Sequence, residues 1–83
     1  MTSTEKLQRL AKLERRMLLI ANSRGHVVRT SGPGAFIVVK PCQQRLYHCV
    51  KCGLEIEVNS APAPNEIEIA GPAVALNCPK ANQ

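Results

Sequence analysis

The residue types in this chain with the clearest capacity for chemistry are its four cysteines, Cys42, Cys49, Cys52 and Cys78. Cys49 and Cys52 stand three positions apart in YHCVKCGLEIEV, between two segments that alternate apolar and polar residues. A turn that carries thiols at positions i and i+3 directs both sulfurs at one centre, as tetrahedral Zn²⁺ requires. Gly53 directly follows the pair, and a glycine there lets the chain turn back and lets backbone N–H groups approach the sulfurs. The spacing therefore predicts a metal site.

The stretch Cys-Val-Lys-Cys-Gly resembles a zinc knuckle, the half-site that is found in zinc ribbons and rubredoxin-like modules. A ribbon repeats the knuckle, whereas the second half-site here would have only Cys78, followed by Pro79. We therefore expect Cys42 and Cys78 to complete a four-thiolate site for Zn²⁺ with Cys49 and Cys52. Such a site leaves no open coordination position for a catalytic water, so the expected role of the metal is structural.

Other assignments of the thiols stay open at this point. Three thiolates with His26 or His48 also make a zinc site, although His48 and Cys49 are neighbours whose side chains would point to opposite faces of a strand. The cysteines could also be buried thiols without a metal. A redox pair needs a helix N-terminus at the first thiol to lower its pKa. A segment with a period of two residues follows Cys52, which argues against that role.

The composition explains why a metal would be useful. The chain of 83 residues, expected to be the single domain 1–83, has one Phe, one Tyr and no Trp, so its core must be thin and aliphatic. A structural zinc contributes roughly 10 to 16 kcal/mol of apparent binding free energy in small zinc domains. Basic residues interrupt the apolar residues of the N-terminal segment, which argues against a signal peptide or a membrane span. We therefore expect a cytoplasmic protein, in which thiols stay reduced.

The elements that must position the thiols begin with an amphipathic helix over residues 4–23. Thr2 and Glu5 have the spacing of a capping box, and Gly25 stands where a left-handed C-terminal cap is expected. At 100° per residue one broad face gathers apolar side chains, which we expect to pack on a sheet rather than to pair with another helix. These residues are Leu7, Leu10, Leu13, Met17, Leu18 and Ala21.

After Gly25 the period changes from helical to extended, and residues 26–80 read as a β-rich region. The expected elements are a hairpin of 26–30 with 35–40, a second hairpin of 44–48 with 54–58 around the knuckle, a strand at 66–70 and another at 74–77. The predicted fold class is therefore α+β. An N-terminal helix packs on a small, mainly antiparallel sheet that carries a zinc-knuckle hairpin, the part that is similar to half of a zinc ribbon.

Charge is uneven along the chain. Residues 1–51 carry a net charge of +8 and residues 52–83 a net charge of −3, for the total of +5. A basic half suits an anionic partner, although a solvated helix face also explains such charges. The basic side chains that we expect to contact a partner are Arg9, Lys12, Arg15, Arg16, Arg24 and Arg29.

These features predict a protein without catalytic activity. The chain has no Asp, which excludes a Ser-His-Asp triad and acidic calcium loops, and it has no nucleotide-binding glycine-rich loop. We expect a zinc-binding module whose basic helix face binds duplex or structured nucleic acid. The alternative is an accessory or inhibitory factor that docks on an acidic protein surface or on a nucleic-acid-binding surface of a larger complex.

Overall fold

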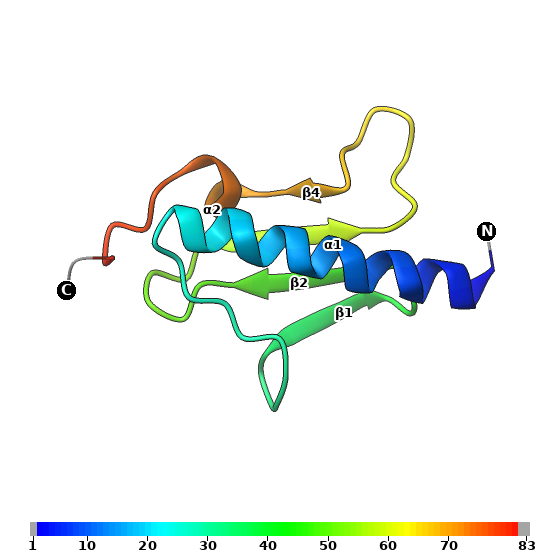
Figure 1. Cartoon of the computed structure of the whole chain (residues 1–83), viewed down its shortest axis with the longest axis horizontal. Coiled ribbons are helices and arrows are strands. Elements are labelled where there is room, and N and C mark those ends of the chain that lie inside the picture. The colour runs from blue at the N-terminus through cyan, green and yellow to red at the C-terminus, as the bar shows by residue number, and fades with distance from the viewer. Residues whose placement is uncertain (1, 82–83) are drawn as a thin grey trace.

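The computed structural model describes residues 2–81 and has the predicted α+β fold (Figure 1). It consists of helix α1 (Ser3–Ser23), strands β1 (Phe36–Lys40), β2 (Gln44–His48), β3 (Glu55–Asn59) and β4 (Ile69–Ala70), and the short helix α2 (Pro72–Ala75). The strands form one antiparallel sheet in the order β1-β2-β3-β4. In Figure 1 α1 lies over one face of this sheet and runs roughly along the strands, and α2 lies beside its C-terminal half.

Both ends of α1 carry the predicted caps. Thr2 is the N-cap, and its hydroxyl oxygen accepts the N–H of Glu5 at 3.2 Å. At the other end Gly25 has a φ of +80°, its N–H donates to the carbonyl of Asn22, and the N–H of His26 donates to the carbonyl of Ala21 at 2.9 Å. These two bonds form a Schellman motif. Because this motif ends the helix and reverses the chain, it fixes the position of His26 next to the end of α1.

The core lies between α1 and the sheet, as the apolar face of the helix predicts. Its buried residues are Leu10, Leu13, Met17 and Ala21 from α1, Tyr47, Ile56 and Val58 from the sheet, and Ala73 from α2. Tyr47 supplies most of the aromatic contribution, and its hydroxyl donates to the Glu14 carboxylate at 2.7 Å. Leu7, at the N-terminal end of the apolar face, is 43% exposed and lies outside the buried core.

The prediction that residues 26–30 pair with 35–40 was wrong. β1 instead pairs with β2, and among the described residues the 26–30 segment forms one isolated bridge, between Val28 and Cys49. A tight turn explains this pairing. Gln43 donates its N–H to the carbonyl of Lys40 at 3.1 Å, with Pro41 and Cys42 at the two central positions. Cys42 has a φ of +62°, so this is a type II turn, which joins neighbouring strands directly.

The C-terminal part of the sheet also differs from the prediction. The strand expected at 66–70 is reduced to Ile69–Ala70. The segment expected as a strand at 74–77 is not a strand, and its first two residues are the end of α2. Pro72 occupies the first turn of α2, where its fixed φ and missing N–H favour a helix. Gly71 lies so close to β3 that a Cβ there would be 2.5 Å from the carbonyl oxygen of Glu55. A glycine is therefore needed at this position, where the chain leaves β4 and enters α2.

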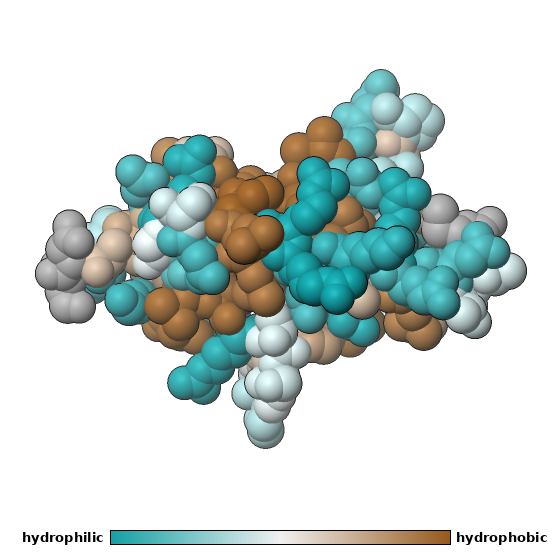
Figure 2. Space-filling model, in the orientation of Figure 1, coloured by the Kyte–Doolittle hydropathy of each residue, from teal (hydrophilic) through white to brown (hydrophobic). Residues whose placement is uncertain are grey.

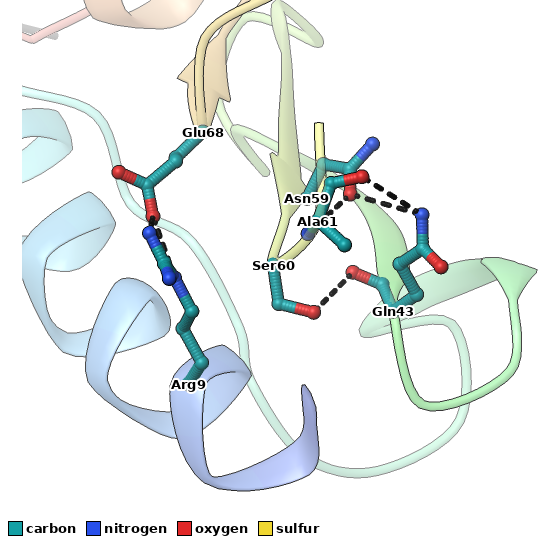
Figure 3. Close-up of polar contacts among 6 residues, drawn as sticks. All are labelled: Arg9, Gln43, Asn59, Ser60, Ala61 and Glu68. Atoms are coloured by element: carbon teal, nitrogen blue, oxygen red, sulfur yellow. Dashed lines mark hydrogen bonds and ion pairs between the residues drawn. The ribbon is translucent and has the colours of Figure 1, made fainter. Parts of the chain in front are cut away.

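Polar contacts fasten the long 60–68 connection to the β1–β2 turn and to α1 (Figure 3). The side chain of Gln43 donates to the carbonyl of Ala61 at 3.2 Å, and the Ser60 hydroxyl donates to the carbonyl of Gln43 at 3.4 Å. On the other side, Arg9 of α1 forms an ion pair with Glu68 at 2.6 Å. The connection therefore leads back to β4 beside α1.

Candidate metal centre

Four potential metal ligands meet at one end of the molecule: His26, Cys49, Cys52 and Cys78. They come from three places in the chain. His26 follows the C-terminal cap of α1, Cys49 and Cys52 belong to the turn between β2 and β3, and Cys78 follows α2. One ligand atom from each residue lies within 4.8 Å of the others, and all but Cys52 are buried. This arrangement could hold a metal ion.

The distances between these atoms suit a tetrahedral ion with sulfur and nitrogen ligands. Ordinary zinc–ligand bond lengths at tetrahedral angles place two sulfurs about 3.8 Å apart, and a sulfur and a nitrogen about 3.5 Å apart. The Cys49 and Cys78 sulfurs are 3.9 Å apart, and the Cys52 sulfur is 3.5 Å from Nδ1 of His26. A disulfide needs about 2.05 Å between sulfurs, so these thiols are free.

His26 is oriented as a ligand through Nδ1. Its Nε2 lies 2.8 Å from the carbonyl oxygen of Leu76, and since a carbonyl only accepts, Nε2 carries the proton and donates it. Nδ1 therefore keeps its lone pair, and it faces the sulfur of Cys52. Metal-bound histidines characteristically donate their second ring N–H to a carbonyl or carboxylate, which sets the tautomer and the ring orientation.

The knuckle turn has the backbone geometry that its sequence predicts. Gly53 has a φ of +80°, and its N–H donates to the carbonyl of Cys49 at 2.9 Å. The N–H groups of Val27 and Lys51 point at the Cys49 sulfur, at 3.5 and 3.4 Å. Hydrogen bonds of this kind stabilise a thiolate, which is the form that binds metals.

The two knuckle thiols ionise differently. Burial opposes ionisation of Cys49, but the backbone N–H groups of Cys52, Val27 and Lys51 lower its pKa to about 6. Burial raises the pKa of Cys52, and the sulfurs of Cys49 and Cys78 raise it further, against the N–H of Leu54. The lowered pKa favours the thiolate form of Cys49, which is the form that binds metals.

Cys42, predicted as the fourth thiolate, is not a member of this cluster. It lies in the β1–β2 turn, while Cys49 follows the other end of β2. Seven residues of extended chain span about 23 Å, so one strand separates the two thiols. His26 takes the fourth position. His26 was predicted only as an alternative ligand, although Gly25 indicated that the chain reverses immediately before it.

His48, the other alternative ligand, is exposed and is not part of the cluster. It pairs with Glu55 in the sheet, next to the buried pair formed by Tyr47 and Ile56. Its side chain therefore points away from α1. The alternation of side chains along a strand predicted this separation of His48 from Cys49.

The six basic residues predicted to bind a partner differ in exposure and in their contacts. Lys12, Arg15 and Arg16 are exposed on α1, whereas Arg9 on the same helix is paired with Glu68. The remaining two lie outside α1. Arg24 is half-buried at the C-cap and bonds to the Asn77 side chain at 3.2 Å, and Arg29 is exposed in the 26–30 segment.

Figure 2 shows two kinds of surface along α1. Hydrophilic side chains gather over its N-terminal half, and an apolar area covers the region of its C-terminal half and α2. Leu19 belongs to that second half and is 72% exposed, and Leu76 after α2 is 55% exposed. Hydrophilic and apolar surfaces are therefore neighbours on the face of the molecule that α1 covers.

Comparison with protein-family models, with curated proteins and with solved structures gives no match. The likeness to zinc ribbons therefore stays limited to the knuckle. Across residues 2–81, neither helix combines the length and the apolar character that crossing a bilayer would need.

Proposed function

We propose that this protein is a small non-catalytic module in which His26, Cys49, Cys52 and Cys78 hold one structural Zn²⁺. The observation that carries the proposal is the convergence of one imidazole nitrogen and three sulfurs within 4.8 Å of one another. Zn²⁺ prefers this ligand set and this geometry, and a site with four protein ligands has no position left for a reacting water.

The metal would reinforce parts of the fold that already meet through backbone hydrogen bonds: Cys78 donates its N–H to the carbonyl of Arg24, and Val50 donates to the carbonyl of Val27, both at 2.8 Å. His26 belongs to the end of α1, the knuckle to the β2–β3 turn, and Cys78 to the segment after α2. The core between them is thin, and zinc binding can supply more free energy than the whole stability of a typical small domain. Removal of the ion should therefore loosen this end of the molecule first.

Elemental analysis of protein purified without chelator tests the site. We expect one zinc per chain in the wild type and its loss in Cys52→Ser and Cys78→Ser. Cys42→Ser is the matched control, since it removes a thiol outside the cluster and should keep one zinc. A folded wild-type protein without metal, or loss of zinc in Cys42→Ser alone, would contradict the proposal.

We infer, as the binding role of the module, that Lys12, Arg15 and Arg16 contact the phosphate backbone of duplex or structured nucleic acid. All three are exposed, and within residues 2–81 none of them forms an ion pair. Their spacing places them along the outer side of α1, opposite the buried Leu13 and Met17. Phosphate contacts of this kind carry affinity without reading sequence.

A protein partner is the second candidate, and the exposure of Leu19 favours it. Leu19 lies one turn beyond Arg15 and Arg16 on α1 and is 72% exposed. An apolar side chain adds little to a phosphate contact, but it is a usual component of a protein interface. The matching partner would be an acidic surface with an apolar centre.

Charge reversal separates the two candidates. The variant Lys12→Glu, Arg15→Glu, Arg16→Glu should lose nucleic-acid binding, with the salt slope falling by about 0.9 for each lost contact. The control Arg29→Glu, Lys40→Glu, Lys80→Glu has the same net charge but leaves α1 unchanged. If wild-type protein does not bind nucleic acid at low salt, the phosphate role is wrong. Loss of a protein partner in Leu19→Ser would then support the second candidate.

A further inference from the structure

β1 is an edge strand with an unusually apolar surface. It is the first strand in the sheet order, so among the described residues its outer edge has no neighbouring strand. Three consecutive side chains in it are large and exposed: Ile37 at 64%, Val38 at 54% and Val39 at 48%. An exposed edge presents unpaired backbone N–H and C=O groups, which are a template for another strand.

Both faces of the sheet are apolar at this edge. Ile37 pairs with Leu46 on the face turned away from α1, since the neighbouring pair, Phe36 with Tyr47, faces the core. Val38 lies on the α1 side but stays exposed, because α1 packs mainly on β3 and does not cover β1. A strand added to β1 would therefore meet apolar side chains above and below the sheet.

β1 also lacks most of the features that protect edge strands. It contains no Pro, and its single charged residue, Lys40, stands at its end. Native edges are usually protected by a charge or a Pro in the strand, or by a covering loop. One protective feature is present, a register shift between Val38 and Lys40, which twists that end of the strand.

We propose that β1 pairs with β1 of a second copy of this chain, antiparallel about a two-fold axis at Val38, and joins two sheets into one. In this register Ile37 lies opposite the partner's Val39, and Val38 lies opposite the partner's Val38. Lys40 then lies opposite the partner's Phe36 and not opposite its own copy. In this register the strand meets its own copy without like charges opposite one another, as an isologous interface requires.

A second copy fits this edge better than a charged foreign strand would. Residues 36–39 carry no charge, so they offer no side chain that would form an ion pair with an acidic or basic partner strand. The short ladder buries less than the roughly 1,200 Å² of a standard interface, so the dimer is weak. Each copy carries a net charge of +5, so added salt should strengthen association by screening repulsion. This is the opposite of the salt effect on nucleic-acid binding.

Sedimentation velocity of the zinc-loaded full chain tests the dimer. Over a rising concentration series the weight-average mass should increase from 9.0 kDa toward twice that value, and more so at high salt. Val38→Lys places two ammonium groups together at the axis and should abolish the increase. Leu19→Lys is the matched control, because it makes the same kind of change on exposed α1 and should dimerise like the wild type.

Amide hydrogen exchange of the wild type is an independent measure of pairing at β1. It tests the dimer even if Val38→Lys does not fold. Exchange at the β1 amides should slow as protein concentration rises, because their N–H groups become bonded across the axis. A wild type that stays at 9.0 kDa throughout overturns the proposal. Association that survives in a folded Val38→Lys protein, or that is lost in Leu19→Lys, also overturns it.

Discussion

The ring of His26 is held between a backbone carbonyl and a thiol: Nε2 donates to the Leu76 oxygen at 2.8 Å, and Nδ1 lies 3.5 Å from the Cys52 sulfur. The carbonyl sets the tautomer that leaves Nδ1 free to bind a cation. Leu76 stands two residues before Cys78, so the same short segment orients one ligand and supplies another.

Loss of an outer-shell hydrogen bond weakens metal binding by about 10- to 100-fold. His26→Ala removes a ligand itself, so it should weaken zinc binding by more than this. Competition with a chelator of known affinity measures the change. His48→Ala is the control, because His48 is exposed and lies outside the cluster, and its affinity should equal that of the wild type. Equal affinities in the two variants would exclude His26 as a ligand.

Gly25→Ala should destabilise the protein and weaken zinc binding together. Gly25 has a φ of +80°, and an added Cβ would lie 2.6 Å from Cβ of Ala81, so the segment after Cys78 must move. Gly32→Ala is a matched control, since Gly32 has a similar φ of +89° but no atom within 4 Å of an added Cβ. The left-handed conformation costs about 1 to 2 kcal/mol in either variant.

Denaturant unfolding and zinc competition on both glycine variants separate strain from contact. Gly25→Ala should lose more stability than Gly32→Ala, and only Gly25→Ala should lose zinc affinity. Similar effects in the two proteins would mean that the contact between Gly25 and Ala81 does not support the site.

Cys42→Gly should stabilise the protein by about 1 kcal/mol, because a left-handed residue with a Cβ is strained and glycine is not. Cys42 has a φ of +62° at the third position of a type II turn, where glycine is preferred. Cys42→Ala keeps the Cβ and should give no gain. Thermal unfolding compares the two variants, and both should keep their zinc. No difference between them would show that the turn is unstrained.

Tyr47 should ionise only in strong alkali. Burial, the largest cause, and the hydrogen bond to Glu14 raise its pKa to about 12, while Arg45 acts in the opposite direction. Since the folded pKa lies above the unfolded value near 10.0, the stabilisation is complete below pH 10 and is lost between about pH 10 and 12. The shift corresponds to about 3 kcal/mol.

Near-ultraviolet absorbance of the phenolate can follow this titration directly, because Tyr47 is the only Tyr in the chain and there is no Trp. A midpoint close to 10 in protein that is still folded would contradict the buried environment. Free tyrosine amide in the same buffers gives the reference midpoint.

Local features of the chain could be predicted from the sequence because short-range physics sets them. The apolar spacing and the capping residues Thr2 and Gly25 placed α1 to within one residue of its observed start, Ser3. Alternation predicted the β2–β3 hairpin, and the spacing of Cys49, Cys52 and Gly53 predicted the knuckle turn. Each of these depends on neighbours a few residues apart.

Which distant residues meet was decided only by the tertiary structure. The type II turn at Cys42 pairs β1 with β2 and so sends Cys42 to the end of β2 opposite Cys49. The Schellman motif after α1 brings His26 to the knuckle instead, and α2 returns Cys78 to it. Strand direction and the packing of α1 on the sheet set these long-range distances, and neither is encoded in the spacing of the cysteines.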